Sequence, residues 1–505
     1  MASESFDVII VGAGLSGVGA AVHLQRECPG RSYAILESRD AMGGTWDLFR
    51  YPGIRSDSDM HTLGYSFKPW RDPKAIADGP SICAYVNETA RENGIEEHIR
   101  YRHRVTRMEW SSQDASWIVT AQRGDGGDSV QLRCNFLMMC AGYYSYRQAH
   151  TPDFPGREDF TGTVIHPQFW PEELDYSGKR VVVIGSGATA MTLVPAMADQ
   201  AESVTMLQRS PTYVFSRPAK DWFANTLRAL LPDTWAYAIT RWRNVLWQQW
   251  VYRRTRTAPD KVRDLLLKRV REELGPDYDI DTHFTPSYNP WDQRLCLVPD
   301  SDLFKALRNG RAQVVTDTIE RFTDSGIRLA SGEMLEADII VTATGLELVV
   351  MGEAEVVVDG ETVDFSRTWS YKGLMYTGVP NLVTTFGYIN ASWTLRADLT
   401  AEYCCRLLRH MAETGAVKVV PALRPEDADM PERDWIEDFP AGYMRRAMHK
   451  FPKQGDREPW INPQNYRKDR LMFRNAPLED GALQFSGPEP AVGEDAGETL
   501  LREAS

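Results

Sequence analysis

The chain has 505 residues, of which 43% are hydrophobic and 25% charged, as in ordinary globular proteins with several domains. Its net charge of −13 argues against general nucleic-acid binding, because no broad cationic face is available for phosphates. No apolar run reaches the roughly 18 residues of a spanning helix, and the N-terminus lacks a signal-peptide pattern. Seven cysteines without a C-x-x-C motif argue against a disulfide framework. We therefore expect a cytoplasmic protein.

The first chemical signal is a glycine-rich turn after an apolar strand. Residues 6–17, FDVIIVGAGLSG, predict a strand, a tight turn and a helix whose N-terminus faces a pyrophosphate. A second apolar strand, YAILE, ends at Glu37, where a carboxylate can accept the hydroxyl protons of an adenosine ribose. The order of strand, helix and acid predicts a dinucleotide site rather than a bare βαβ unit. Its expected contacts are Gly12, Gly14, Ser16, Gly17 and Glu37.

The pattern recurs at residues 179–190, KRVVVIGSGATA. The following strand, SVTMLQRS, carries Arg209 where the first unit carries an acid. A guanidinium binds a 2′-phosphate through charged hydrogen bonds, whereas a carboxylate repels it, so the second unit is predicted to select NADP over NAD. The alternative is a solvated arginine at a strand end. The expected contacts are Gly185, Ser186, Gly187, Ala188, Thr189, Ala190, Arg209 and Ser210.

Two dinucleotide folds with different endings predict an α/β protein with two Rossmann-like domains, one for FAD and one for NADPH. The apolar segments 136–145 and 337–347 end in small residues, and Gly142 and Gly345 are predicted to mark crossings between the domains. The expected divisions are 1–150 (FAD, first part), 151–345 (NADP, with a helical insert at about 218–290), 346–486 (FAD, second part, and substrate pocket) and 487–505 (disordered tail).

Two longer motifs carry a family resemblance. One is Phe160-x-Gly162-x-x-x-His166-x-x-x-Trp170-Pro171, and the other is Gly43-Gly44-Thr45-Trp46-x-x-x-x-Tyr51-Pro52-Gly53-x-x-x-Asp57. Both resemble signatures of type I Baeyer–Villiger monooxygenases, within the flavin-containing monooxygenase superfamily. The resemblance spans about residues 6 to 490. The runs GGTWDLFRYPGIRSDSDM and YNPWDQRLCLVP are especially similar to the ethionamide-activating branch.

The first motif lies between the two predicted nucleotide folds. A histidine whose two ring nitrogens bond to backbone on either side could fix this linker, with Trp170 as an apolar anchor. We therefore interpret His166 as a conformational residue, while a general base remains the alternative.

The resemblance implies a reaction. NADPH reduces FAD, and the reduced flavin adds O₂ to form a C4a-peroxyflavin, which attacks a ketone to give an ester or lactone or oxidises a sulfide or thioamide sulfur. The expected partners are O₂ and a small ketone or sulfide. One alternative is a flavin-containing monooxygenase that acts mainly on S or N, and another is a non-catalytic flavin/NADP sensor. A disulfide reductase is disfavoured because no redox cysteine pair is present.

The resemblance also implies catalytic residues. Arg294 aligns with the family arginine that stabilises a peroxide anion; one charge at ~4 Å in an effective dielectric of ~20 contributes about 4 kcal/mol. The alternative is a surface ion pair with Asp292. Asp57 aligns with the carboxylate that partners this arginine and contacts the nicotinamide. Gln293 replaces a lysine that many members use for the 2′-phosphate. The further cofactor contacts implied are Gly44, Thr45, Trp46, Asp47, Leu48 and Val105 for FAD, and Arg55 and Ser56 for NADP.

Two aromatic features remain open. Residues 235–254 place Trp242, Leu246 and Trp250 on one helical face. We expect this face to pack on the core, with a substrate entrance or membrane-surface patch as the alternative. FGYINASW, ending at Trp393, precedes a helix whose start is expected to face the flavin, where its dipole would stabilise the reduced form. Trp393 is predicted to line the substrate pocket or to belong to the core.

Overall fold

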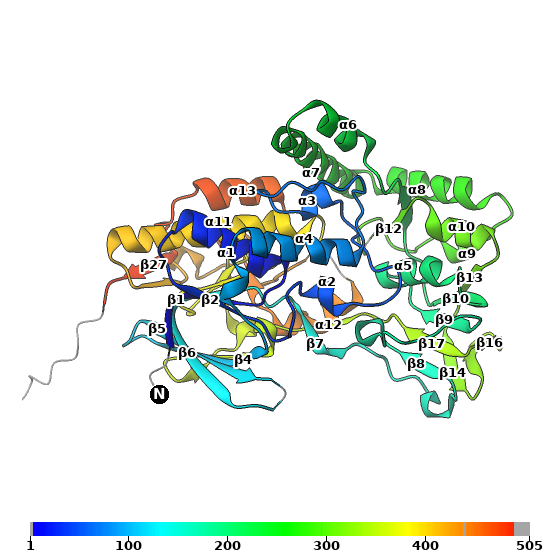
Figure 1. The fold of residues 1–505 in the computed structure, drawn as a ribbon, viewed down its shortest axis with the longest axis horizontal. Helices are drawn as coiled ribbons and strands as arrows, with labels where there is room; N and C mark the ends of the chain where they lie inside the picture. Colours follow the sequence, from blue (N-terminus) through cyan, green and yellow to red (C-terminus); the bar gives the residue numbers. More distant parts are fainter. Residues whose placement is uncertain (1–3, 125, 294, 438–440, 489–505) are drawn as a thin grey trace, which may run out of the picture.

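The computed structural model describes residues 4–124, 126–293, 295–437 and 441–488. Two sheets built around parallel strands lie next to each other in the molecule (Figure 1). The predicted α/β class is confirmed. Arg294 and all but two residues of the expected tail lie outside the described residues.

The larger sheet has the order β20-β19-β4-β5-β6-β1-β2-β3, with β23 paired to β6. Its centre is parallel, because β1 runs alongside β2 and β6 in the same direction. Residues from both ends of the chain contribute to it. Its strands are β1 (Glu4–Val11), β2 (Tyr33–Leu36), β3 (Ile99–Arg100), β4 (His103–Ser111), β5 (Ser116–Arg123), β6 (Ser129–Met139), β19 (Glu355–Val358), β20 (Glu361–Thr362) and β23 (Leu382–Thr384).

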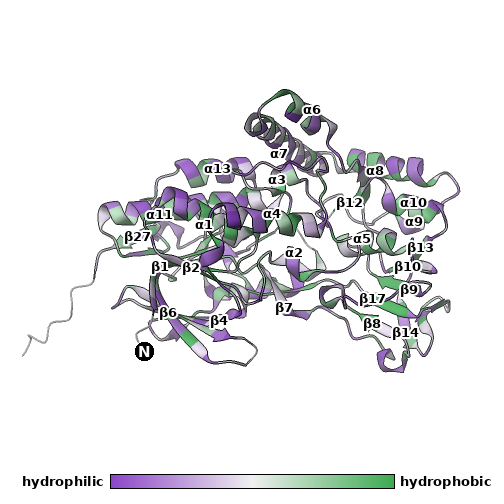
Figure 2. Cartoon of the chain, in the orientation of Figure 1, coloured by the Kyte–Doolittle hydropathy of each residue, from purple (hydrophilic) through white to green (hydrophobic). Residues whose placement is uncertain are grey.

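The smaller sheet has the order β13-β10-β9-β17-β8, and its four strand pairings are all parallel. Two of its inner strands, β9 and β17, consist mainly of buried valine and isoleucine, as expected for a sheet covered on both faces, and they are mostly green in Figure 2. The strands are β8 (Thr163–Ile165), β9 (Arg180–Ile184), β10 (Ser203–Gln208), β13 (Ala312–Thr316) and β17 (Ile339–Thr342).

Helices cover both sheets. α1 (Leu15–Glu27), α4 (Gly79–Glu92) and α11 (Trp393–Thr414) lie over the larger sheet, while α5 (Ala188–Met197) and α10 (Asp302–Arg308) pack on the smaller one (Figure 1). A short sheet of β14 (Ile319–Thr323), β15 (Gly326–Leu329) and β16 (Met334–Glu336) closes the other face of the smaller sheet.

The chain passes between the two sheets through two segments that pair with each other. β7 (Tyr144–Ala149) follows β6, and β18 (Leu346–Leu348) follows β17; the two short strands are antiparallel. The glycines expected at these crossings, Gly142 and Gly345, have φ values of 78° and 109°. Such values favour glycine over residues with a Cβ. The two connections between the sheets therefore lie side by side and are held together by the pairing of β7 with β18.

A helical insert separates β11 (Val214–Arg217) from its parallel partner β12 (Cys296–Pro299). Helices α6 and α7 project from the main body (Figure 1), and α7 contacts α3 (Met60–Leu63) beside the larger sheet. The insert helices are α6 (Trp222–Leu230), α7 (Asp233–Thr257), α8 (Pro259–Leu274) and α9 (Ile280–His283).

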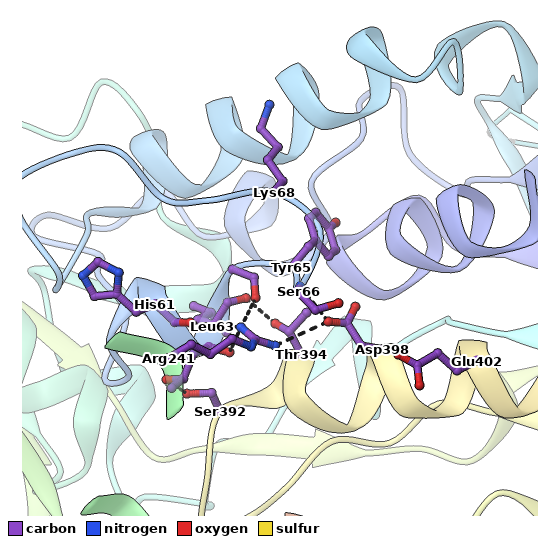
Figure 3. A network of polar contacts seen from close by, with 12 residues as sticks. His61, Leu63, Tyr65, Ser66, Lys68, Arg241, Ser392, Thr394, Asp398 and Glu402 are labelled. Atoms are coloured by element: carbon purple, nitrogen blue, oxygen red, sulfur yellow. Dashed lines mark hydrogen bonds and ion pairs between the residues drawn. The ribbon is translucent and has the colours of Figure 1, made fainter. Parts of the chain in front are cut away.

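A buried arginine attaches α7 to the larger sheet's helices (Figure 3). The Nη1 of Arg241 donates to the carbonyl oxygens of His61 at 3.0 Å and Gly64 at 2.7 Å, and Nη2 lies 3.4 Å from Asp398 Oδ2 on α11. His61 lies within the one-turn helix α3 and Gly64 directly follows it. The last four carbonyls of a helix lack helical partners, so the guanidinium satisfies acceptors that would otherwise be unpaired. The polar side of α7 thus faces the protein.

The expected packing of the α7 aromatic face on the core is wrong. Trp242, Leu246 and Trp250 are all exposed, because the opposite, polar side of the helix makes the buried contacts. In the part of the chain that the structure describes, no helix is long and apolar enough to cross a membrane.

Candidate dinucleotide and active site

The principal cavity lies at the carboxyl edge of the larger sheet. It has a volume of about 680 Å³ and is lined by residues that follow β1, β2 and β6 directly, including Gly12, Glu37 and Cys140. Ligands of open parallel sheets bind at this edge, and cofactor sites have volumes of roughly 300–1,000 Å³. Of the predicted residues, the cavity is lined by Gly12, Gly14, Ser16, Glu37, Gly44, Thr45, Trp46, Leu48, Ser56, Asp57 and Val105.

The glycine turn leaves a bare helix N-terminus at the cavity. Gly14 is the N-cap of α1 and provides no side-chain cap, so the first N–H groups remain available to an anion. A Cβ on Gly12 would lie 2.5 Å from the Cys140 carbonyl oxygen. Gly17 does not line the cavity; a Cβ there would lie 1.8 Å from the Gly12 carbonyl oxygen, so it allows α1 to pack on the turn.

Glu37 is buried and held by backbone donors. Its two carboxylate oxygens accept from the amides of Ala13 at 2.7 Å and Arg39 at 2.9 Å. The oxygen bound by Arg39 also accepts from the Ser38 hydroxyl at 3.2 Å. The oxygen bound by Ala13 keeps a second lone pair, so the carboxylate can still accept from a hydroxyl in the cavity. The residue is therefore fixed in orientation before any ligand binds.

The segment 43–48 forms another side of the cavity. Gly43 and Gly44 have φ values of 118° and 59° and precede α2 (Thr45–Leu48). The Thr45 hydroxyl lies 2.7 Å from the Tyr144 hydroxyl. Asp47 does not line the cavity but pairs with Arg39 at 2.8 Å, and this pair fixes the turn from behind.

Residues 51–53 pack on the smaller sheet's helix rather than on their own sheet. Tyr51 belongs to the hydrophobic core around α5, and burial raises its pKa to about 12 despite a hydrogen bond with Thr189. Gly53 has φ 75°, and a Cβ there would lie 2.6 Å from the Ala196 Cβ of α5. No side chain fits between the loop and the helix.

The same loop returns to the cavity. Arg55 does not line the cavity; it forms an ion pair with Asp302, at the start of α10. The next two residues, Ser56 and Asp57, do line it, and Asp57 is exposed to solvent there. The second family motif thus physically joins the cavity to the smaller sheet.

An aromatic wall completes the cavity. Trp393, the first residue of α11, stacks on Tyr143 at 5.1 Å between ring centroids and lies 5.3 Å from Phe386. Its indole N–H donates to the Ser16 hydroxyl at 2.8 Å. Trp393 therefore belongs to the cavity lining. Tyr143, Tyr144 and Tyr146 also line the cavity and were not predicted. Their only signal in the sequence is the aromatic run YYSY directly after a buried strand.

The second glycine motif forms a similar but open site. Gly187 is the N-cap of α5 without a side-chain cap, and an added Cβ would meet nothing within 4 Å. Gly185, at φ 137°, would bring a Cβ within 2.4 Å of the Ala343 carbonyl oxygen. The Ser186 hydroxyl donates to the Ser210 carbonyl at 3.1 Å, so the motif and the loop carrying exposed Arg209 lie together. Ala188, Thr189 and Ala190 form the first turn of α5.

The linker histidine bonds to backbone with both ring nitrogens. Nδ1 of His166 accepts from the Gln168 amide at 3.1 Å, and Nε2 donates to the Gly345 carbonyl at 3.2 Å. Burial lowers the pKa of His166 to about 4, against the opposing effect of the Gly345 bond, so the ring is neutral at pH 7. His166 thus ties the linker to the second domain crossing.

The other motif residues fill space around this linker. Phe160 and Trp170 are buried in two different cores that lie on either side of the smaller sheet. A Cβ on Gly162 would lie 2.4 Å from the Asp338 carbonyl oxygen, and Pro171 is exposed.

All seven cysteines are free. Asp292 pairs with Arg256 at 2.6 Å.

Known proteins similar to this chain share both its sequence and its fold. Residues 7–242 match the family model described as flavin-binding monooxygenase-like. The chain is 53% identical over 492 residues to the FAD-containing monooxygenase EthA of Mycobacterium tuberculosis, covering 97% of this chain and 100% of the relative. It is 48% identical over 487 residues to the probable FAD-binding monooxygenase AlmA of Acinetobacter baylyi, covering 95% and 96%.

Solved structures match over nearly the whole chain. An oxidized steroid monooxygenase bound to NADP has a TM-score of 0.75 at 22% identity, covering 96% of this chain and 100% of that one. An open structure of cyclohexanone monooxygenase has a TM-score of 0.74 at 19% identity, with the same coverage. At these identities the likeness concerns the fold.

Proposed function

This chain belongs to the FAD-containing monooxygenases, and from that premise we propose that it is an NADPH- and O₂-dependent Baeyer–Villiger monooxygenase. It inserts one oxygen atom next to a ketone carbonyl to give an ester or lactone, and it also oxidises sulfide or thioamide sulfur. Residues 1–150 and 346–486 form the FAD-binding part, and 151–345 the NADP-binding part. The observation that carries the proposal is the loop 51–57, which lines the cavity at one end and packs on α5 at the other.

The residues of the cavity fit FAD. An uncapped helix N-terminus at Gly14 suits a pyrophosphate, the fixed carboxylate of Glu37 suits ribose hydroxyls, and the volume of about 680 Å³ suits a large cofactor. When bound, FAD supplies the electron transfer and oxygen activation on which the reaction depends. The protein supplies binding, orientation and exclusion of water.

The second site fits NADPH. The uncapped start of α5 at Gly187 has open space above it for a pyrophosphate. Arg209 and Ser210, joined to that turn through Ser186, supply a cation and a hydroxyl for the 2′-phosphate. Gln293 leaves this discrimination mainly to Arg209.

Two residues are proposed to control charge during the reaction. Asp57 lies at the cavity on the loop packed against α5, where it can contact both the nicotinamide and a neighbouring cation. Arg294, which lies outside the described residues, is assigned as that cation on family resemblance alone. A permanently protonated guanidinium suits this role because it stays charged at every working pH.

The aromatic wall is proposed to shape the substrate space. Tyr143, Phe386 and Trp393 line the cavity and contact one another through their rings. Such a lining favours apolar ketones and thioethers over charged substrates. His166 keeps its conformational role: neutral and bonded to backbone at both nitrogens, it holds the linker during cofactor movement.

A product analysis tests the proposal. The FAD-loaded protein is incubated with NADPH and, separately, a cyclic ketone series and a thioether, under ¹⁸O₂. We expect lactones that carry one ¹⁸O atom and NADPH consumption that rises with ketone concentration. Sulfoxide without any lactone would assign the protein to heteroatom oxidation. NADPH oxidation that yields only hydrogen peroxide, or no oxidation at all, would remove the monooxygenase assignment.

A further inference from the structure

Helix α7 is amphipathic in an unusual sense, because its polar face points into the protein. Tyr237, Arg241, Asn244 and Gln248 recur at helical spacing on one side, and the amides of Asn244 and Gln248 donate to the two carboxylate oxygens of Asp59 at 2.8 and 3.1 Å. Arg241 adds hydrogen bonds to the carbonyls of His61 and Gly64, so several bonds hold this side against the protein. The helix cannot rotate to bury its other face without breaking these bonds.

The other face is aromatic and exposed. Trp235, Ile239, Trp242, Leu246 and Trp250 recur at spacings of four, three, four and four residues, which forms a continuous stripe. Trp235 is 67% exposed and Trp250 53%. Figure 1 shows α6 and α7 projecting from the main body.

The neighbouring helix α6, which packs against α7, adds further exposed hydrophobic side chains. Trp222 and Leu230 of α6 are 76% and 73% exposed, and Trp247 stacks on Trp250 at 5.1 Å. Ten of the fourteen large hydrophobic side chains that are exposed in the described residues lie between 222 and 265. Scattered surface hydrophobics are normal, but a concentration of this kind marks an interaction site. We call this patch the α6–α7 outer face.

Cations border the α6–α7 outer face. Residues 218–257 contain seven Lys and Arg against two Asp, in a chain whose net charge is −13. Of the seven, Arg241 is buried and Arg243 pairs with Asp221, so these two do not contribute to the border. Helix α13 (Tyr466–Asn475) lies beside α7, and the guanidinium of Arg470 sits 4.8 Å from the Trp242 ring. Nearby Arg256 and Arg474 are paired with carboxylates. No carboxylate within the described ranges lies at ion-pair distance from Arg253, Arg254, Arg467, Lys468 or Arg470.

We propose that the α6–α7 outer face binds the surface of an anionic lipid bilayer, with its tryptophans at the headgroup level and the bordering cations on lipid phosphates. Tryptophan next to arginine is the combination that the membrane interface favours, because one end of each side chain is apolar and the other polar. Binding is peripheral, since no described helix could span the bilayer. A second copy of the chain is a poorer occupant, because a two-fold interface would place the same unpaired cations opposite one another.

Vesicle binding tests the proposal without using the reaction. The FAD-loaded protein is sedimented with vesicles of phosphatidylcholine alone and of phosphatidylcholine containing about 30 mol% phosphatidylglycerol. We expect binding to the anionic vesicles only, weakening as salt rises. In vesicles carrying brominated lipid tails, the tryptophan fluorescence of the wild-type protein should be quenched, a readout that needs no variant.

Variants separate the contribution of the cations to vesicle binding from that of the tryptophans. Arg253→Gln with Arg254→Gln should weaken binding about twenty-five-fold, since each interfacial cation contributes about fivefold. Trp235→Ser, Trp247→Ser and Trp250→Ser together should abolish sedimentation while flavin content and circular dichroism stay unchanged. The matched control replaces exposed hydrophobic residues elsewhere on the surface, Met334→Ser with Leu423→Ser, and should bind as the wild type does.

Three results would overturn the proposal. The first is absence of both sedimentation and quenching with anionic vesicles. The second is a loss of vesicle binding in the control variant that is as large as the loss in the triple tryptophan variant. The third is a dimer in sedimentation velocity that the tryptophan substitutions dissociate, which would assign the α6–α7 outer face to self-association.

Discussion

Replacing Arg241 by Met removes the charge that attaches the helical insert while keeping the length of the side chain. The guanidinium is buried and serves the carbonyls of His61 and Gly64 as well as the carboxylate of Asp398. Removing one partner of a buried ion pair costs roughly 3–5 kcal/mol. Asp398 retains His23 at 3.3 Å, so we expect the lower end, about 3 kcal/mol of unfolding free energy.

Urea unfolding followed by tryptophan fluorescence measures this loss, because α7 carries several tryptophans. The urea m-value of a chain of this size exceeds the roughly 1–3 kcal/mol per molar of small proteins, so the loss of about 3 kcal/mol should lower the midpoint by somewhat less than about 1 M. The matched control is Arg253→Met on the same helix, an exposed position that should change stability by about 0.5 kcal/mol or less. If Arg241→Met and the control shift the midpoint equally, the buried network does not hold α7 in place.

Three further outcomes are expected. Arg209→Ala should raise the KM for NADPH by about ten- to hundredfold, the value of one charged hydrogen bond, and leave the KM for NADH nearly unchanged; equal changes would remove the 2′-phosphate assignment. His166→Gln should lower the coupling of NADPH oxidation to product by about fivefold, the value of one hydrogen bond, without changing the product; total loss with normal flavin content would indicate direct chemistry. Burial opposes protonation of His23, but its bonds to Asp398 and Glu27 outweigh burial and raise its pKa to about 9. Because the pKa of His23 is higher in the folded protein than in the unfolded chain, protonation of His23 stabilises the fold by about 3 kcal/mol. This stabilisation is fully present below pH ~6.5 and is lost as the pH rises through ~9. The melting temperature should fall over that range, and the fall should be shallower in His23→Gln.

Much of the cofactor geometry was predictable because it is encoded locally. The glycine turn at 12–17 and the acid at Glu37 each follow a strand directly, so parallel pairing alone brings them to one sheet edge. The tyrosines after β6 escaped prediction, since an aromatic run at a strand end has no distinctive spacing.

The orientation of α7 could not be predicted from periodicity. The spacing of Trp242, Leu246 and Trp250 correctly indicates two different faces, but it does not show which face meets the protein. That choice depends on acceptors far away in the sequence, the carbonyls of His61 and Gly64 and the carboxylate of Asp398, which only the folded chain brings to Arg241. The general rule that the hydrophobic face of a helix packs on the core therefore gave the wrong prediction for α7.

The contact of Gly53 with α5 has a mechanical consequence. Residues 51–57 follow β2 in the chain, but they pack against the helices of the smaller sheet. Gly53 fits closely against Ala196 of α5, and Arg55 forms an ion pair with Asp302 at the start of α10. A rigid rotation of the smaller sheet with its helices would carry this loop along and shift Asp57 relative to the turn at Gly12. The width of the cavity is thereby coupled to the angle between the two sheets, so a single larger side chain at position 53 would alter the starting angle and not merely loosen the packing.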